Sequence, residues 1–320
     1  MKTQQELTDY INEAIASIPY PQQPAGLYEP IAYTLSSGGK RLRPTLLLSV
    51  MEALGGKASD AVNQAMGIEM YHNFTLVHDD VMDNADLRRG RPTVVHKWGR
   101  DTAILSGDAM LTMATQLMAR CPADKLPDVM DVFNRTAMEV YEGQQYDMEF
   151  EQRVDVSVEE YMNMIRLKTS VLLAGACEIG AVMAGAPAEV RRAFYDYGVS
   201  LGLAFQLRDD YLDTYGDPLI FGKEIGGDIV NGKKTWLLIT ARSEDSDGAL
   251  SRIMAANPAP QEKIEAVREI YDALNLPRRI TRLIEQYTDN AVRVLDTVSL
   301  QPGWKDYFTS LALSLNDRAL

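Results

Sequence analysis

The chain has 320 residues, enough for one large helical domain or two smaller ones. Acidic residues outnumber basic ones by 45 to 32, giving a formal net charge of −13, which argues against nucleic acid or an anionic membrane surface as a general partner. Only Cys121 and Cys177 occur, without a pairing pattern, so we expect a reducing compartment. No apolar run approaches the roughly 20 residues that span a bilayer, and the first residues lack a signal-peptide core. These features predict a cytoplasmic protein that is not an integral membrane protein.

Apolar residues recur at helical spacing along most of the chain. The expected helices cover residues 4–17, 29–54 with a break at 36–39, 60–84, 101–119, 128–153, 157–186, 188–215, 233–242, 247–255, 260–275, 277–298 and 304–318. No alternating run is long enough to build a sheet, and no linker clearly divides the chain. The sequence therefore predicts an all-α fold, a single large helical bundle around a central cavity, in one domain over residues 1–320.

An Asp-Asp-x-x-Asp motif occurs twice, each time inside a strongly apolar helical segment. The two sets are Asp79, Asp80 and Asp83, and Asp209, Asp210 and Asp213. The first and last carboxylates of each set are four residues apart, so they share a helix face one turn apart. Carboxylates this close repel one another and need a cation if they face inward. Hard oxygen ligands without a thiol or imidazole cluster favour Mg²⁺, with phosphate oxygens completing its shell.

Two carboxylate sets in a helical cavity would also suit a di-iron centre, which needs a Glu-x-x-His pair on each of two helices. Glu69 and His72 provide one such pair, whereas His78 and His96 lack a Glu three positions earlier. The iron centre therefore fails on ligand count.

Basic residues and glycines accompany the first carboxylate set. Residues 38–44, Gly-Gly-Lys-Arg-Leu-Arg-Pro, offer close backbone approach and three basic side chains in four positions. Residues 86–92 place further arginines just after the carboxylates, where guanidinium groups can grip phosphates bidentately. His72 lies two turns before Asp79 on the same helix face. Together these residues indicate a site for diphosphate as well as metal.

At these residues the sequence resembles the trans-isoprenyl diphosphate synthases, or polyprenyl synthetases, of the short-chain type. The resemblance spans about residues 38–236 and includes 143–147, 168–169 and 222–233, and the segment 311–318 is similar to the family's closing helix. It implies an isoprenoid-synthase-type bundle, a homodimer, and a prenyltransferase of isoprenoid biosynthesis. The implied reaction joins an allylic diphosphate (dimethylallyl, geranyl or farnesyl) to isopentenyl diphosphate, head to tail, with three Mg²⁺ ions per active site.

The resemblance also implies a role for each motif residue. Asp79, Asp80 and Asp83, together with Asp209, would hold the magnesium ions around the allylic diphosphate, and Asp210 and Asp213 complete the second motif. Arg88, Lys168, Lys223 and Lys233 would bind that diphosphate, while Gly39, Lys40, Arg43, His72 and Arg89 would bind the diphosphate of isopentenyl diphosphate. Thr169 and Gln206 would lie along the allylic chain, where their dipoles stabilise a carbocation. We also expect the loops near 38–43 and 221–233 to close over the substrates and exclude water.

Three residues before the first motif bear on product length. Phe74 lies five residues before Asp79, about 7.5 Å along the helix axis, and Tyr71 lies three residues further back on the same face. Bulky side chains here resemble a tunnel floor that stops elongation early, and Thr75 beside them is small. We therefore predict an all-trans product of fifteen or twenty carbons. The alternatives are a longer-chain polyprenyl diphosphate synthase, a class I terpene cyclase and a non-catalytic partner subunit.

Overall fold

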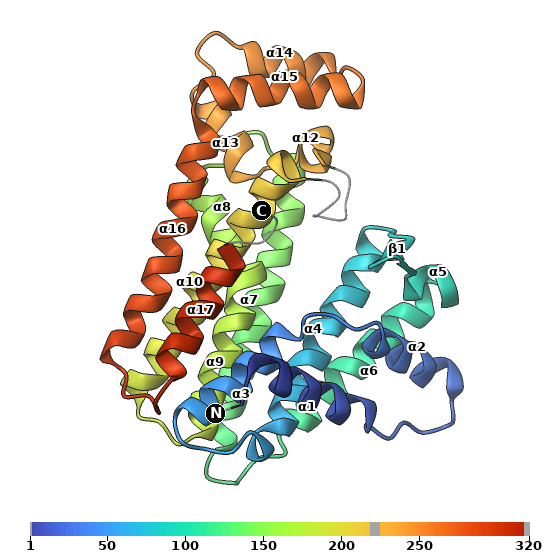
Figure 1. Cartoon of the computed structure of the whole chain (residues 1–320). Helices are drawn as coiled ribbons and strands as arrows, with labels where there is room; N and C mark the ends of the chain where they lie inside the picture. Colours follow the sequence, from blue (N-terminus) through green and yellow to red (C-terminus); the bar gives the residue numbers. More distant parts are fainter. Residues whose placement is uncertain (1, 218–224, 317–320) are drawn as a thin grey trace. The chain divides into compact units, whose positions relative to one another are not determined.

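The computed structural model describes residues 2–217 and 225–316, and its helices gather in two compact units. Unit 1 comprises Met1–Arg135, Gly175–Phe194 and Ser299–Trp304, and unit 2 comprises Thr136–Ala174, Tyr195–Val298 and Lys305–Leu320. The predicted all-α class is confirmed (Figure 1). One domain over residues 1–320 stays a prediction.

The elements follow the predicted helices closely. Unit 1 contains α1 (Gln4–Ala16), α2 (Ala25–Ser36), α3 (Leu42–Ala53), η1 (Ala58–Asp60), α4 (Val62–Met82), β1 (Leu87–Arg88), β2 (Arg91–Pro92), α5 (Val94–Trp98) and α6 (Arg100–Met118). Among the described elements, four helices have residues in both units: α7 (Leu126–Gln152), α9 (Val171–Met183), α10 (Ala188–Tyr215) and α17 (Trp304–Asn316). The remaining elements are α8 (Val158–Ile165), η2 (Arg166–Ser170), α12 (Gly227–Asn231), α13 (Trp236–Ser243), α14 (Ala249–Ala256), α15 (Pro260–Ala273), α16 (Leu276–Val294) and η3 (Leu295–Thr297).

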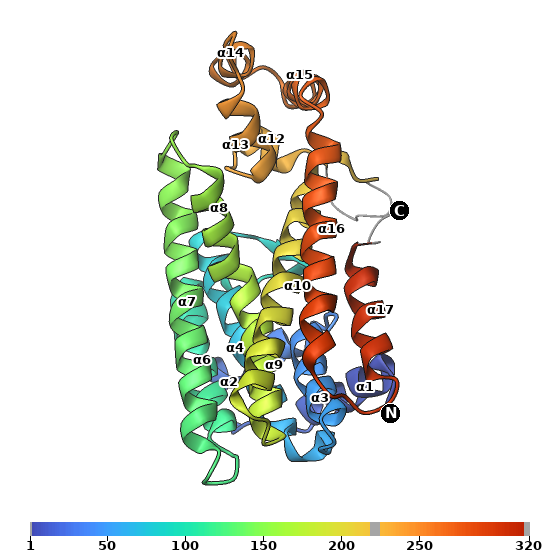
Figure 2. The same ribbon diagram turned by 90° about the vertical axis from the view of Figure 1, so that its left-hand side faces the viewer.

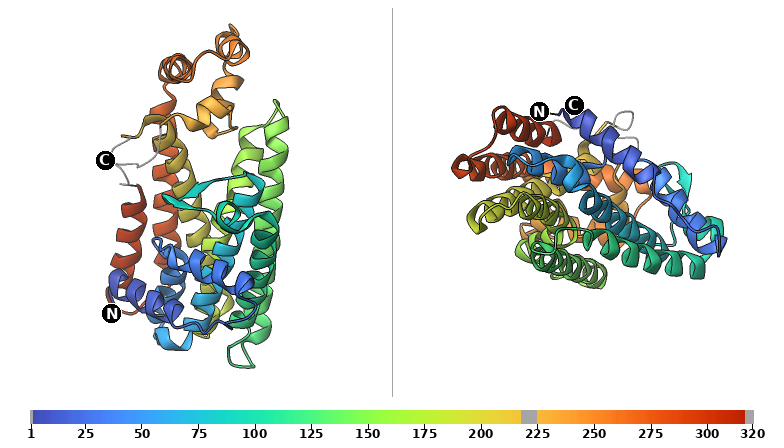
Figure 3. Two further views of the ribbon diagram at one scale, coloured as in Figure 1. Left: turned by 90° about the vertical axis from the view of Figure 1, so that its right-hand side faces the viewer. Right: turned by 90° about the horizontal axis from the view of Figure 1, so that it is seen from below.

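Helix α4 is the central element of unit 1. It packs against α1, α3 and α6 (Figures 1 and 3). Gly67 permits a close crossing with α6, because a Cβ atom there would lie 3.2 Å from the carbonyl oxygen of Ala114. Ile68 and Met70 are fully buried in the same stretch. This packing fixes the helix whose last turns carry the first carboxylate set.

In unit 2, the helices after residue 225 surround one apolar cluster. Helix α13 packs against α8 and α16, and α15 packs against α12, α14 and α16 (Figure 2). Tyr161, Leu207, Leu237, Ile280 and Ile284 are among its buried members. The cluster therefore joins the end of α10, which carries the second carboxylate set, to the helices that follow it.

The prediction of one uninterrupted helix over residues 157–186 is wrong in one respect. The single-turn π-helix η2, Arg166–Ser170, separates α8 from α9. Two glycines let neighbouring backbones approach it: a Cβ atom on Gly143 would lie 2.3 Å from the Lys168 nitrogen, and one on Gly202 would lie 2.5 Å from the Ser170 Cα. π-Turns are often found at functional sites, and this one carries two residues of the predicted site.

None of the helices within the described residues has the length and hydropathy needed to cross a membrane.

Candidate active site

The predicted site residues fall into two groups, each inside one unit. We call the unit 1 group the α4 half-site; it contains Gly39, Lys40, Arg43, His72, Asp79, Asp80, Asp83, Arg88 and Arg89. The unit 2 group, the α10 half-site, contains Lys168, Thr169, Gln206, Asp209, Asp210, Asp213 and Lys233. Lys223 lies outside the described residues, as does part of the segment 221–233.

The three carboxylates of the α4 half-site lie at the C-terminal end of α4, and Asp83 is the C-cap residue. The helix dipole places partial negative charge there, so the carboxylates are electrostatically unfavourable without a cation. Arg88 supplies one, because its Nε donates to Asp80 Oδ1 at 2.8 Å. Burial raises the pKa of Asp80, the Arg88 charge opposes that rise, and the charge of Asp83 adds to it.

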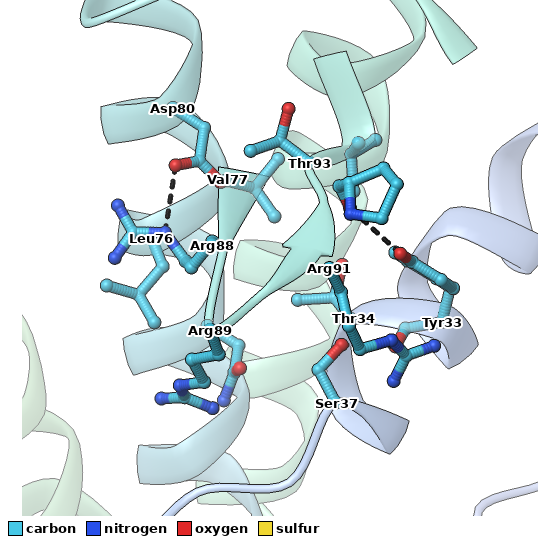
Figure 4. Close-up of a pocket in the computed structure, with 13 residues that line it drawn as sticks. Tyr33, Thr34, Ser37, Leu76, Val77, Asp80, Arg88, Arg89, Arg91 and Thr93 are labelled. Carbon is cyan, nitrogen blue, oxygen red and sulfur yellow. Dashed lines mark hydrogen bonds and ion pairs between the residues drawn. The ribbon is translucent and has the colours of Figure 1, made fainter. Parts of the chain in front are cut away.

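Arg88 reaches Asp80 from a two-residue hairpin, β1–β2, that follows α4 (Figure 4). Arg88 pairs with Arg91 across the hairpin, and the two residues between them, Arg89 and Gly90, have φ angles of 54° and 73°. Two consecutive positive φ angles define a type I′ turn, whose twist matches that of paired strands. Tyr33 Oη anchors the hairpin by donating to the Pro92 carbonyl at 2.8 Å.

The left-handed turn directs Arg89 toward the loop between α2 and α3. Its Nη1 donates to the Gly38 carbonyl, and a Cβ atom on Gly39 would lie only 2.7 Å from the same nitrogen. Gly39 itself has a φ of 133°, a conformation that side chains rarely adopt. The loop therefore needs glycine where the guanidinium group approaches. Lys40 follows as an exposed residue.

Arg43 and His72 meet beside this loop. Arg43 Nη1 lies 3.2 Å from His72 Nε2, and because arginine only donates hydrogen bonds, that ring nitrogen accepts. Burial, followed by the charges of Arg43 and Arg89, holds the pKa of His72 well below its ordinary value. Burial also lowers the pKa of Arg43, to about 10. Arg43 Nε is buried without a hydrogen-bond partner among the described residues, and a bound anion would satisfy such a donor.

In the α10 half-site, the π-turn η2 presents two adjacent polar side chains. Lys168 Nζ donates to Asp147 Oδ2 at 2.5 Å. Thr169 Oγ1 donates to Gln206 Oε1 at 3.0 Å, and Gln206 Nε2 in turn donates to Asp210 Oδ1 at 3.1 Å. The structure thus joins Thr169 and Gln206, as their expected common role requires, and links them to the second carboxylate motif.

Asp210 is the buried member of that motif. Its second oxygen, Oδ2, accepts from the hydroxyl of Tyr161, and its residue exposure is only 2%. Burial raises the pKa of Asp210 to about 7, although Lys233 and the two hydrogen bonds oppose the rise. Both oxygens of Asp210 therefore face donors of the protein itself. Sequence reasoning missed Tyr161, since a tyrosine on an amphipathic helix signals only core packing.

Asp213 joins α10 to the short helix α12. Its Oδ2 accepts from the backbone N–H of Asp228 at 2.9 Å, and its carbonyl accepts from the Gly226 N–H at 2.5 Å. Lys233 Nζ lies 3.5 Å from Asp228 Oδ1. Partial burial opposes the charge on Lys233, but Asp228, Asp210 and Asp147 outweigh it and raise its pKa. Asp228 thus orders the backbone that carries Lys233.

The carboxylate oxygens of the half-sites are suitable ligands for magnesium, although the described residues do not form a complete coordination shell by themselves. Within the described ranges, no group of three or more His, Cys, Asp or Glu side chains is arranged to hold a metal ion. Mg²⁺ commonly binds through one or two carboxylates and takes waters and substrate phosphates as its other ligands. Asp80 and Asp83 interact closely enough to shift a pKa, and hard oxygens suit this ion. The donors present therefore fit magnesium bound together with phosphate.

The residues predicted to limit product length lie together on α4. The rings of Tyr71 and Phe74 are 5.5 Å apart between centroids, and Phe133 meets Tyr71 at the same distance. Both Tyr71 and Phe74 are buried. Thr75 Oγ1 donates to the His72 carbonyl at 2.8 Å. The contact is as expected, and a role in setting product length stays a prediction.

The chain is similar to known proteins in both sequence and fold. Residues 24–274 match the family model described as polyprenyl synthetase. The geranylgeranyl pyrophosphate synthase of Geoglobus acetivorans is 37% identical, over 96% of this chain and 96% of that protein. The geranylfarnesyl diphosphate synthase of Natronomonas pharaonis is 37% identical over 84% of this chain and 83% of that protein. A crystal structure of a geranylgeranyl pyrophosphate synthase superimposes with a TM-score of 0.94 at 45% identity, covering 100% of both chains.

The depressed pKa of His72 predicts a pH dependence of stability. The unfolded chain takes up a proton at this histidine near pH 6.5, whereas the folded protein does not, so the free energy of unfolding should fall as the pH drops below about 6.5. His72→Gln keeps an acceptor for Arg43 but removes the titration. Between about pH 7 and pH 5 we expect the wild type to lose more stability than this variant, by up to about 1.4 kcal/mol per pH unit.

Urea unfolding at a series of pH values measures this difference. His96→Gln is the matched control, because the His96 side chain is 54% exposed and lies in α5. The control should follow the wild type, and identical slopes for wild type and His72→Gln would contradict the prediction.

Tyr161→Phe removes the hydroxyl that donates to Asp210 Oδ2. Leaving a buried acceptor unsatisfied costs about 1–3 kcal/mol, and we expect the free energy of unfolding to fall by that amount. Tyr20→Phe is the control, because the Tyr20 hydroxyl is buried and has no hydrogen-bond partner among the described residues. Equal losses in chemical unfolding would show that the hydroxyl of Tyr161 is not what matters.

Proposed function

The chain belongs to the polyprenyl synthetase family and is a prenyl diphosphate synthase, a transferase, and on that premise we propose how its residues act. In the proposed reaction, the C–O bond between an allylic group and its diphosphate breaks, and the allylic carbon forms a C–C bond with the double bond of isopentenyl diphosphate. A proton then leaves the new chain, and inorganic diphosphate is released. No protein nucleophile is required.

The observation that supports this function best is the grouping of cations around the loop between α2 and α3 in the α4 half-site. Arg43 contacts His72, and Arg89 contacts the loop at Gly38, so their guanidinium groups flank one region next to the exposed Lys40. Two or more guanidinium groups beside glycine backbone are suited to a diphosphate. We assign this region to the diphosphate of isopentenyl diphosphate.

The allylic diphosphate is assigned to Arg88, Lys168 and Lys233, with Lys223 as a further expected contact. Each of the three described cations already contacts a carboxylate, namely Asp80, Asp147 and Asp228 respectively. Such pairs keep the cations oriented before the substrate arrives, so less ordering is needed on binding. Thr169 and Gln206 direct their dipoles along one hydrogen-bonded chain, which supports their role beside a developing carbocation.

Asp79, Asp80, Asp83 and Asp209 are the residues that we propose to hold Mg²⁺, in three ions per site. When bound, these ions supply charge neutralisation for the departing diphosphate. Asp210 and Asp213 differ from this group, because Asp210 faces Tyr161 and Gln206 and Asp213 accepts from the Asp228 backbone. We infer that these two residues of the second motif mainly hold Asp209 and α12 in place.

A homodimer and a cytoplasmic location are further proposals. Leu105 on α6 is 60% exposed and Ile104 beside it is 39% exposed, which supports an apolar contact with a second copy. Light scattering after size-exclusion chromatography measures the mass directly, and a stable monomer would argue against the dimer.

The proposed activity is tested by incubating the purified chain with Mg²⁺, isopentenyl diphosphate and dimethylallyl, geranyl or farnesyl diphosphate in turn. We expect turnover that requires both substrates and stops when the metal is chelated. Product formed without isopentenyl diphosphate would instead indicate a cyclase, and no turnover would indicate a partner subunit.

Product length is predicted to depend on Phe74. Relatives are named for geranylgeranyl and geranylfarnesyl products, and for this chain we propose fifteen or twenty carbons with Phe74 and Tyr71 as the floor. Phe74→Ala removes the buried ring, so the products should lengthen by at least one five-carbon unit, as read by chromatography of the dephosphorylated alcohols. Phe74→Tyr keeps the bulk and serves as control. Unchanged product length in Phe74→Ala would place the floor elsewhere, and a much longer wild-type product would favour the longer-chain alternative.

A further inference from the structure

A buried ion pair joins the end of the loop between α2 and α3 to helix α4. Arg41 Nη1 donates to Glu69 Oε1 at 2.6 Å, and the two side chains are only 3% and 4% exposed. Glu69 is one turn of α4 away from His72, and Arg41 is two residues before Arg43. Both members of the Glu-x-x-His pair of α4 thus contact arginines: Glu69 contacts Arg41, and His72 contacts Arg43.

The other donors of Arg41 are also engaged. Nη2 donates to the Leu35 carbonyl at 2.6 Å, and Nε donates to Asn12 Oδ1 at 3.0 Å. The guanidinium group thus joins α1, α2 and α4 at a single point. With its three nitrogens bonded and the residue 4% exposed, Arg41 is not positioned to bind a ligand, in contrast to Lys40 and Arg43.

The backbone of Arg41 shows how this contact shapes the loop. Its φ is 46°, in the left-handed region, and it is the N-cap residue of α3. An arginine in this conformation is strained and persists only where surrounding contacts impose it. The Arg41 carbonyl accepts from the Thr45 N–H at 3.1 Å, which starts α3. Consequently the direction in which Lys40 and Arg43 leave the backbone depends on Arg41.

Glu69 also interacts electrostatically with two other arginines of the half-site. Its negative charge raises the pKa of both Arg43 and Arg89, against the lowering caused by burial. It is therefore close enough to interact with the two guanidinium groups assigned to diphosphate. A carboxylate that is free to pair with them would compete with a bound anion.

We propose that Arg41 is a positioning residue for the diphosphate of isopentenyl diphosphate: it fixes residues 37–43 on α4 and keeps Glu69 from pairing with Arg43 or Arg89. This inference rests on the proposed function for the identity of the substrate. The geometric part, an anion site whose cations are kept available by the Arg41–Glu69 pair, concerns any diphosphate.

A double-mutant cycle tests the proposal. Arg41→Met should raise KM for isopentenyl diphosphate about tenfold or more, the size expected when one charged hydrogen-bonded group is lost, with a much smaller change in KM for the allylic diphosphate. Adding Glu69→Gln to Arg41→Met removes the competing charge and should recover part of that rise, the remainder being the lost positioning of the loop. Asn12→Ala is the matched control, because it removes one neutral partner of Arg41 and should change KM less than about threefold. Thermal unfolding shows that each variant is folded.

Two outcomes would overturn the proposal: equal changes in both KM values, or no recovery in the double variant. If Arg41→Met does not fold, Arg41→Lys tests the positioning part alone: it keeps a charge for Glu69 but loses the bonds to Asn12 and the Leu35 carbonyl, and it should still raise KM for isopentenyl diphosphate selectively. Calorimetric titration of the metal-free protein with inorganic diphosphate distinguishes a failure of the proposed function from a failure of the proposed role of Arg41. A wild type without turnover refutes the proposed function, whereas diphosphate binding that is equal in wild type and Arg41→Met refutes the role of Arg41.

Discussion

Both half-sites are governed by the requirement that a buried charge must have a partner. Removing a carboxylate or guanidinium group from water is costly, and only hydrogen bonds and opposite charge offset that cost. Asp80 is matched by Arg88, and Glu69 by Arg41. Asp210 receives two neutral donors, Tyr161 and Gln206, and its pKa stays raised. The motif carboxylates Asp80 and Asp210 are therefore held in direction by the neighbouring donors that they contact.

Three departures from regular backbone place the cations. The left-handed Arg41 starts α3, the type I′ turn at Arg89 and Gly90 directs the hairpin, and the π-turn η2 presents Lys168 beside Thr169. Each conformation is less stable in isolation than a helix or extended strand. Each lies at or beside residues predicted for the site within its own unit, which agrees with the tendency of strained backbone to occur where function needs an unusual direction. Rigid helices on either side keep these short segments from relaxing.

Long helices were predictable because apolar residues repeat every three to four positions, and the bounds of α4 and α10 differ from expectation by only a few residues. The π-turn η2 was not, since one extra residue per turn scarcely alters that repeat. Motif spacing likewise predicted Asp79 and Asp83 on one face, but not Tyr161 or Asp228 as partners of the second motif. Such partners come from distant segments, and single tyrosines or aspartates carry no pattern. Arg41 is one of three basic residues in the run 38–44, and nothing in the sequence indicated that it contacts Glu69 and the Leu35 carbonyl.

Neutral His72 shows why the α4 half-site does not simply gather as many cations as possible. Arg41, Arg43, Arg88 and Arg89 all lower the pKa of this histidine, so a further positive charge there would be repelled by each of them. A neutral ring instead accepts from Arg43 and fixes the direction of its guanidinium group. Orientation is thus obtained without additional repulsion, and the arginines keep their charge for the ligand.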